Sequence, residues 1–187
     1  MNDALLAHQR LFANLHSIAP QIDAALQLLK VCMVRGNKIM LCGNGGSAAD
    51  CQHFAAELTG RYKSDRHPLA AIALTTDTSA LTAIANDYGY QSVFERQVRA
   101  LGKSGDVLIG ISTSGSSVNV LLALEAAILV GVTPILMTGE KAEYFNRFHE
   151  VRVPSTDTPR LQEAHAFILH HFAEEIEASY LSWPKTS

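Results

Sequence analysis

Short aliphatic segments alternate with longer helical patterns along the chain. Four of these segments lack strict polar alternation, which is typical of strands buried on both faces of a parallel sheet. They cover residues 38–42, 70–74, 107–112 and 133–137. A shorter and more polar segment, residues 150–154, predicts a fifth strand at a sheet edge.

Helices are expected between and around these strands. Residues 47–58 follow a glycine pair and begin with Ser47, a residue type that caps helix N-termini. Residues 117–129 are rich in Leu and Ala, residues 161–181 form a long candidate after Pro159, and the first 35 residues carry an apolar stripe. The alternation predicts an α/β three-layer sandwich with a mainly parallel five-stranded sheet, as one domain over residues 1–187. We expect the N- and C-terminal helices to pack against another subunit.

Composition narrows the class of protein. Of the 187 residues, 48% are hydrophobic and 18% are charged, which is a globular composition. The formal net charge of −3 gives no general attraction for nucleic acid or an anionic membrane. The N-terminal segment has no basic region before an apolar core, so we expect a cytoplasmic protein without a secretion signal. Cys32, Cys42 and Cys51 share no metal-ligand spacing, and we expect buried reduced thiols.

The first candidate binding loop is the glycine-rich run GNGGS at residues 43–47, which follows the first expected strand. Glycine lets backbone N–H groups, here of Gly45 and Gly46, approach an anion at a helix N-terminus. Many strand-to-helix turns need glycine for geometry only. The run matches neither the dinucleotide fingerprint nor the P-loop, because it lacks a third spaced glycine and a Gly-Lys-Ser/Thr sequence.

The second candidate loop, STSGSS at residues 112–117, follows another buried strand and precedes another helix. Its five hydroxyls, including that of Thr113, exceed what one helix cap requires, although a run of serine caps is the simpler interpretation. The loop contains no lysine or arginine. We therefore expect it to bind a single phosphate on a small metabolite through neutral donors.

Several motifs occur in order from Lys38 to the last helix: GNGGSAAD, ALTTD, ANDYG (residues 85–89), GDVLIGISTSGSS and RLQE (residues 160–163). With them the chain resembles the phosphoheptose isomerase family of the sugar-isomerase (SIS) domain superfamily. The resemblance implies isomerisation of sedoheptulose 7-phosphate to D-glycero-D-manno-heptose 7-phosphate through an enediol. This is the first step toward activated heptose for lipopolysaccharide or other surface glycans. The resemblance also implies a homotetramer with one zinc ion per active site.

The same resemblance implies roles for individual residues. Glu57 matches the catalytic base and His170 the catalytic acid. The implied zinc ligands are His53, Glu57, Gln162 and His170. Positions matching substrate contacts are Asn44, Ser47, Asn86, Asp87, Ser112, Ser114 and Ser117, and we add Gly45, Gly46, Thr113, Glu57 and Gln162 as substrate-binding candidates.

Spacing bears on two of these assignments. His53 and Glu57 are four residues apart and share one helix face, which is equally typical of a surface pair. Gln162 and His170 are eight residues apart, about 12 Å along a regular helix, so they reach one ion only if both side chains converge. Two histidines, one glutamate and one glutamine are a plausible set of zinc ligands.

Other polar residues near these motifs have competing interpretations. Arg61 could contact the phosphate or a sugar hydroxyl, or form a surface ion pair with Asp65. His165 and His171 are interpreted as helix-face residues without an assigned role. The chain departs from the family after Thr138-Gly139, where many members carry a double glycine.

Three other functions remain open. A non-catalytic relative binds the replication initiator, but such members lack the counterparts of Glu57 and His170, which are present here. A sugar-phosphate-sensing domain of a transcription factor would be expected with a helix-turn-helix segment or basic region. An isomerase of another ketose phosphate is harder to separate, because phosphate loops do not measure the length of a sugar.

Overall fold

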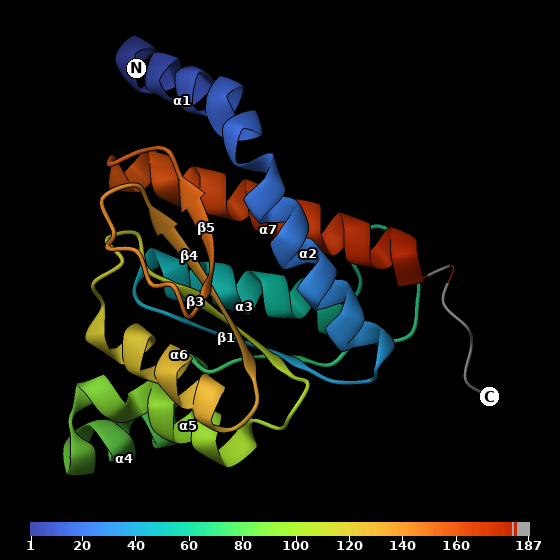
Figure 1. The fold of residues 1–187 in the computed structure, drawn as a ribbon, viewed down its shortest axis with the longest axis vertical. Helices are drawn as coiled ribbons and strands as arrows, with labels where there is room; N and C mark the ends of the chain where they lie inside the picture. Colours follow the sequence, from blue (N-terminus) through green and yellow to red (C-terminus); the bar gives the residue numbers. More distant parts are fainter. Residues whose placement is uncertain (181, 183–187) are drawn as a thin grey trace.

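A five-stranded parallel sheet forms the centre of the computed structural model, which describes residues 1–180 and residue 182 (Figure 1). The strands lie in the order β2-β1-β3-β4-β5. Their bounds are β1 (Ile39–Gly43), β2 (Ala71–Ala73), β3 (Val107–Ile111), β4 (Thr133–Gly139) and β5 (His149–Val153). All four pairings are parallel, so the expected parallel α/β sheet is confirmed.

Strand burial follows position in the sheet. Every residue of the inner strands β1 and β3 is buried, which explains their uninterrupted apolar sequence. The expected strand at residues 70–74 is only three residues long, and its Ile72 is 39% exposed. The expectation of burial on both faces is wrong there, because β2 lies at an edge and pairs only with β1. The edge position expected for residues 150–154 is confirmed in β5.

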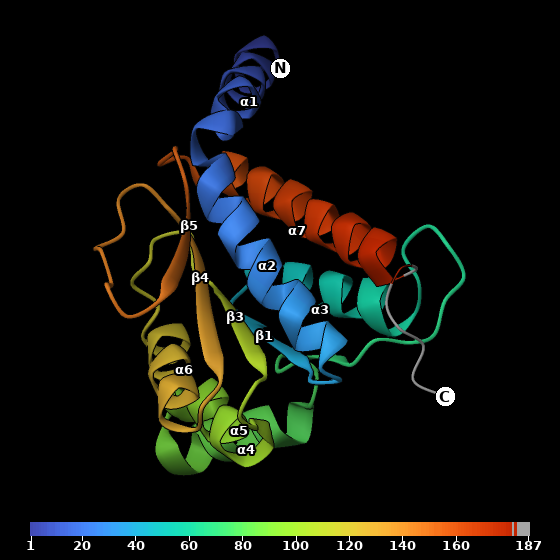
Figure 2. The same ribbon diagram turned by 45° about the vertical axis from the view of Figure 1, so that its right-hand side comes forward.

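Helices cover both faces of the sheet, giving three layers (Figures 1 and 2). One layer contains α2 (Ala19–Val34), α3 (Gly46–Thr59) and α7 (Thr158–Tyr180). The opposite layer contains α4 (Thr78–Tyr88), α5 (Val93–Leu101) and α6 (Val118–Leu129), with the short 3-10 helix η2 (Tyr90–Ser92) between α4 and α5. A large apolar cluster lies on each side of the sheet, so each layer buries its own core.

The N-terminal segment is not one continuous helix. The helix α1 (Asn2–Asn14) is followed by a 3-10 turn, η1 (Leu15–Ile18), before α2 begins. α1 projects beyond the rest of the molecule in both ribbon views (Figures 1 and 2). By length and composition, Asn2–Val34 contains a window apolar enough to cross a membrane, with a mean hydropathy of 1.2. This is weak evidence for a span, because core helices pass the same test; α2 buries Leu26 and Leu29 in the core.

Two helices, α4 and α5, were not expected from the sequence. Asp77 is the N-cap of α4, and its carboxylate accepts a hydrogen bond from the Ala80 N–H at 2.9 Å. Gly89 is the C-cap of α4 and has a φ of 85°, which favours glycine. α5 buries Val93, Phe94 and Val98 on one face, within the second apolar cluster.

Helix ends show two further differences. Ser47 is not the N-cap of α3: Gly45 is the N-cap, with a φ of 56°, and Ser47 lies buried inside the first turn. Ser117 is the N-cap residue of α6, as expected. The expected end of the last helix, at residue 181, lies outside the described residues.

The strand order fixes where a ligand would bind. Chain connections leave β1 toward β2 on one side, and β3 lies on the other side of β1. In an open parallel sheet, the crevice at such a switch point, beyond the carboxyl ends of the strands, is the usual binding site. The register pairs Gly43 with Ile111, so the two candidate phosphate loops begin side by side at this crevice.

Candidate active site

The loop at residues 112–117 is closed by its own hydroxyl groups. The Ser112 hydroxyl donates to the Ser117 hydroxyl at 3.0 Å, and the Ser114 and Ser116 hydroxyls lie 2.8 Å apart. The Ser116 N–H donates to the Ser114 hydroxyl at 3.2 Å. Ser112 is buried, while Ser114 and Ser116 are exposed. The structure thus brings the four serines together in one turn at the N-terminus of α6.

Backbone hydrogen bonds to the end of β4 fix the loop at residues 112–117. The Gly139 N–H donates to the Thr113 carbonyl at 3.2 Å, and the Ser112 N–H donates to the Met137 carbonyl at 3.0 Å. A Cβ atom at Gly115, where φ is 69°, would lie 2.2 Å from the Ala142 Cβ. A larger residue at position 115 would therefore displace the loop. Ala142 belongs to the stretch after Thr138-Gly139 where the chain departs from the resembling family.

The glycine-rich loop at residues 43–47 turns tightly into α3. The Ser47 N–H donates to the Asn44 carbonyl at 3.1 Å. A Cβ at Gly43 would lie 3.0 Å from the Ser47 backbone, so this turn requires a very small residue. Asn44 is half-buried, whereas Gly45 and Gly46 are exposed. The loop has the exposed backbone that anion binding requires.

Asn86, Asp87 and Arg61 lie on exposed segments outside the two loops. The Asn86 amide donates to the Asp87 carboxylate at 2.8 Å in the last turn of α4. The Arg61 guanidinium donates to the Lys63 carbonyl at 3.2 Å. Within the described part of the chain, no ion pair joins Arg61 to Asp65. That alternative for Arg61 receives no support.

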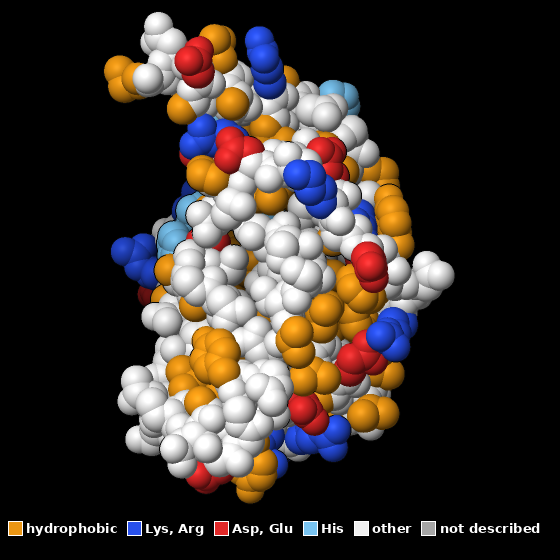
Figure 3. All heavy atoms as spheres, turned by 90° about the vertical axis from the view of Figure 1, so that its left-hand side faces the viewer, with side chains coloured by type: hydrophobic (Ala, Val, Ile, Leu, Met, Phe, Trp, Pro, Cys, Tyr) orange, Lys and Arg blue, Asp and Glu red, His pale blue; other side chains and the backbone are white. Residues whose placement is uncertain are grey.

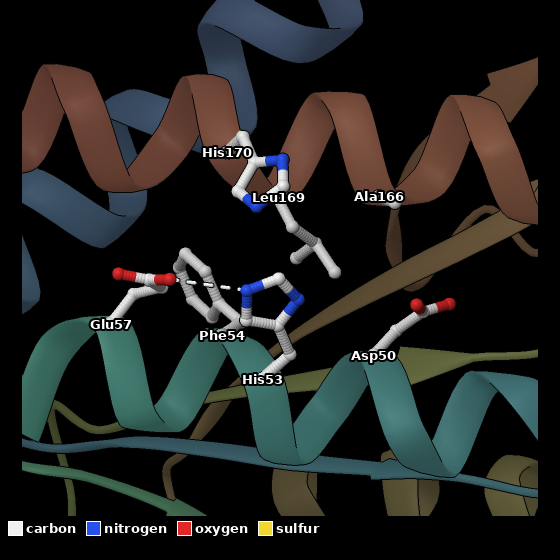
Figure 4. A pocket seen from close by; sticks show the side chains of 7 residues that line it. All are labelled: Asp50, His53, Phe54, Glu57, Ala166, Leu169 and His170. Carbon is white, nitrogen blue, oxygen red and sulfur yellow. Dashed lines mark hydrogen bonds and ion pairs between the residues drawn. The ribbon is translucent and has the colours of Figure 1, made fainter. Parts of the chain in front are cut away.

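His53, Glu57 and His170 converge between α3 and α7 (Figure 4). One potential ligand atom from each residue lies within 4.8 Å of those of the other two. His53 Nε2 and Glu57 Oε1 are 3.1 Å apart, and the His53 and His170 rings meet edge to face at 4.9 Å. Two imidazoles and a carboxylate are typical ligands of a divalent metal, with bonds of about 2 Å that a small side-chain adjustment would permit. The residues present therefore fit a metal ion.

Gln162 lies at the other end of the same interface. A Cβ at Gly46 would be 2.3 Å from the Gln162 Nε2 atom, so the glutamine amide rests on the start of α3. α3 and α7 run in the same direction here, with Gln162 beside Gly46 and His170 beside Glu57. Gln162 and His170, eight residues apart on α7, therefore lie beside different parts of α3. Gln162 contacts Gly46 at the start of α3, and its role as a fourth ligand stays a prediction.

Asp50 is a residue of this site that our sequence reasoning missed. With His53, Glu57 and His170 it lines a small pocket, and its side chain points from α3 toward Ala166 (Figure 4). Burial raises the pKa of Asp50, while the nearby His53 and His170 act in the opposite direction. The signal was present in the sequence, because Asp50 is three residues before His53 and shares its helix face.

A buried carboxylate shapes the loop after α3. Glu177 on α7 accepts hydrogen bonds from the backbone N–H groups of Tyr62, Lys63 and Ser64, at 2.7–3.2 Å. Its carboxylate also lies 3.3 Å from the Arg66 guanidinium. Burial acts to raise the pKa of Glu177, but these N–H groups and Arg66 outweigh it, so the pKa is lowered. The loop that carries Arg61 is therefore anchored to α7.

Arg66 connects Glu177 to the end of α3 that carries Glu57. Its guanidinium donates to the backbone carbonyl of Glu57 at 2.7 Å and to that of Leu58 at 2.9 Å. These are carbonyls of the last turn of α3, which have no partner within the helix. Arg66 thus stabilises the end of the helix that presents Glu57.

His165, interpreted as a helix-face residue without an assigned role, lies on the buried face of α7. Its side chain is completely buried, and burial lowers its pKa to about 4, although the Thr138 backbone acts in the opposite direction. It therefore stays neutral at physiological pH. His171, the other local histidine, is half-buried. The three cysteines are buried and free, as expected.

The sheet order, the two loops and the cluster between α3 and α7 define a sugar-isomerase domain. The sequence profile of the SIS domain matches residues 7–139. A phosphoheptose isomerase from Aliarcobacter butzleri is 53% identical over 175 residues, covering 92% of this chain and 93% of the relative. The chain belongs to the phosphoheptose isomerase family.

Solved structures agree with this placement. A phosphoheptose isomerase from Neisseria gonorrhoeae has a TM-score of 0.88 at 43% identity, covering 95% of this chain and 96% of that one. A phosphoheptose isomerase from Francisella tularensis has a TM-score of 0.90 at 34% identity, with the same coverage. The family resemblance inferred from the sequence motifs is thus confirmed.

Proposed function

We propose that this protein isomerises sedoheptulose 7-phosphate to D-glycero-D-manno-heptose 7-phosphate. Membership of the phosphoheptose isomerase family supports this reaction. The single observation that carries the site is the convergence of His53, Glu57 and His170 from two different helices. Convergence of these residue types from distant parts of the chain is unexpected for a simple surface pair.

The reaction moves a carbonyl group from C2 to C1 through an enediol. The Glu57 carboxylate takes the proton from C1, and the C1–H electron pair becomes the C1–C2 double bond. His170 donates a proton to the carbonyl oxygen on C2. Return of a proton to C2 and loss of the proton on the C1 oxygen then give the aldose, so atoms and charges balance.

A metal ion at His53, Glu57 and His170 would polarise the substrate oxygens at C1 and C2 and stabilise their developing negative charge. We propose zinc, one ion per active site, because two imidazoles and a carboxylate suit it. Gln162 is proposed as the fourth ligand. Asp50, whose carboxylate faces the same pocket, orients the histidines electrostatically.

The phosphate group is assigned to the switch-point crevice. Its binding groups are the hydroxyls of Ser112, Thr113, Ser114 and Ser117, with Asn44, Ser47 and the backbone of Gly45 and Gly46. Asn86, Asp87 and Arg61 are proposed to contact the sugar from its exposed side. Neutral donors at a helix N-terminus suit a monoester, because they bind the anion without a cation of their own.

We further propose that the protein is a cytoplasmic homotetramer. Leu5 and Leu6 on the projecting helix α1 are 54% and 47% exposed. Hydrophobic side chains are visible on the projecting end of the molecule (Figure 3, top). Phe167 on α7 is also half exposed. Apolar side chains gathered on a projecting helix and its neighbour favour coverage by another subunit.

Incubation of the purified protein with sedoheptulose 7-phosphate, followed by NMR, tests the function directly. We expect the aldose signal to appear and to be lost after chelation of the metal. Fructose 6-phosphate, a shorter ketose phosphate, is the matched comparison. No aldose from the heptulose phosphate would refute the proposal, and faster conversion of the hexulose phosphate would favour an isomerase of another substrate.

A further inference from the structure

An amide pair joins the two candidate phosphate loops. The Asn44 Nδ2 group donates to the Asn119 Oδ1 atom at 2.9 Å, and the Asn119 Nδ2 group donates to the Asn44 Oδ1 atom at 2.9 Å. Asn44 belongs to the loop after β1, and Asn119 lies in the first turn of α6, after the serine loop. The pair therefore spans the switch-point crevice.

A tyrosine from the opposite layer completes this network. The Tyr90 hydroxyl, in η2, donates to the Asn44 Oδ1 atom at 3.1 Å. Asn119 is 5% exposed, whereas Tyr90 is 57% exposed. The network thus has a buried partner on one side of Asn44 and an accessible partner on the other.

Counting donors and acceptors shows what remains free on Asn44. An amide oxygen has two lone pairs, and here both accept, one from Asn119 and one from Tyr90. An amide nitrogen has two N–H groups, and one of them donates to Asn119. The group left for a ligand is a single N–H. The reversed amide orientation would instead present a carbonyl oxygen, which repels a phosphate oxygen.

We infer that Asn119 and Tyr90 are positioning residues that lock the Asn44 amide with its free N–H toward the substrate phosphate. This inference rests on the proposed function of the crevice as the phosphate site. The reciprocal bonds also hold the glycine loop and the serine loop at a fixed separation. Neither residue acts on the reacting carbons, so the lock serves substrate affinity more than turnover.

Tyr90→Phe is the mildest test because the side chain is exposed and only the hydroxyl is lost. We expect KM for sedoheptulose 7-phosphate, and the Kd for inorganic phosphate by calorimetry, to rise about 5-fold, the effect of losing one hydrogen bond. The fall in kcat should be smaller. Tyr88→Phe is the matched control, because the Tyr88 ring faces the Arg96 guanidinium.

Asn119→Asp tests the buried side of the lock. A carboxylate can accept from the Asn44 amide but cannot donate to its oxygen, so the reciprocal pair fails at nearly constant volume. We expect phosphate affinity to fall at least about 10-fold, more than in Tyr90→Phe. The new carboxylate at position 119 faces the Asn44 amide oxygen, and this unfavourable contact adds to the lost hydrogen bond. If this variant does not fold, Tyr90→Phe still decides.

A double-mutant cycle separates positioning from direct contact. In an Asn44→Ala background, Tyr90→Phe should no longer change phosphate affinity, because the hydroxyl acts through Asn44. A persistent effect would overturn the inference, as would wild-type affinity in Tyr90→Phe, or no phosphate binding by the wild-type protein. Phosphate titration needs no turnover. Normal titration results without isomerisation would therefore refute only the proposed function.

Discussion

Gly46 and Gln162 are in direct contact across the α3–α7 interface: a Cβ atom at Gly46 would lie 2.3 Å from the Gln162 Nε2 atom. The glycine therefore leaves room for the glutamine amide. Gly46 is the first residue of α3, and its φ is outside the left-handed region. Alanine is thus acceptable to the backbone at this position, and the only conflict is with the end of a flexible side chain.

Gly46→Ala should fold normally and lose activity. Alanine favours a helix more than glycine does, so we expect a melting temperature at or above that of wild type. The new methyl group displaces the Gln162 amide, and we expect kcat/KM to fall about 10-fold, the cost of a misplaced polar contact. Gln162→Ala should cause a similar loss. The double variant should be no worse than either single variant, and additive losses would show that the contact is irrelevant.

Glu57→Gln removes the proposed base while keeping the size of the side chain. We expect kcat to fall by at least ~100-fold, because an amide cannot accept the proton from C1. Zinc content by mass spectrometry separates loss of the base from loss of a ligand. Wild-type turnover would remove Glu57 from the mechanism.

His170→Ala should abolish isomerisation without unfolding the protein. The imidazole is half-buried at the edge of the pocket, so its loss leaves the core of α7 intact. Circular dichroism and NMR turnover measured on the same sample provide the check. A folded variant with full activity would refute the acid role.

Ser114→Ala combined with Ser117→Ala tests the phosphate loop. Each hydroxyl takes part in a pair that closes the turn, so their removal deletes ligand donors and loosens the loop. We expect sedoheptulose 7-phosphate affinity to fall about 10-fold or more, with zinc affinity unchanged. Unchanged affinity for the sugar phosphate would count against the assignment.

Much of this fold could be predicted from its sequence because parallel strands in a sandwich are almost wholly apolar. The runs that became β1, β3 and β4 are buried almost throughout. The length and burial of β2 were overestimated, because Ala71–Ala73 is as apolar as an inner strand. Its edge position depends on the sheet order. α4 was missed because its core-facing side is short: Leu81, Ile84 and Ala85 pack against the second apolar cluster, but none of its residues is fully buried.

Less of the candidate site could be predicted from the sequence. His53 and Glu57 are neighbours on one helix, so their pairing was visible, but their approach to His170 depends on how α3 and α7 pack. Asn119 and Glu177 were missed because a single amide or carboxylate in a helix gives no pattern. Only the tertiary structure shows that Asn119 meets Asn44 and that Glu177 binds the 62–64 loop.

The burial of neutral His165 should make the free energy of unfolding fall in mild acid. Burial lowers the pKa of His165 from 6.5 to about 4, so below pH 6.5 the unfolded chain takes up a proton that the folded chain does not. The stabilisation is complete above pH 6.5 and is lost as the pH falls toward 4, at a cost approaching about 3 kcal/mol. Urea unfolding of His165→Phe should show a shallower decline over this range. A slope equal to that of wild type would contradict the buried neutral state, and His171→Phe is the control.

Glu177→Gln should destabilise the protein by about 3 kcal/mol, because it leaves the Arg66 guanidinium buried without its carboxylate. The lowered pKa of Glu177 places its contribution above pH 4.5, the ordinary value, with loss as the pH falls through the folded value. The variant should therefore lose the part of the acid transition below pH 4.5 and keep the part assigned to His165. Glu174→Gln is the matched control, since Glu174 pairs with Lys63 of the same loop but is half exposed.

Because Glu177 also holds the 62–64 loop beside the His170 ring, proteolysis near residue 63 should become faster in Glu177→Gln and not in Glu174→Gln. Equal unfolding and cleavage in the two variants would show that the loop does not depend on this carboxylate.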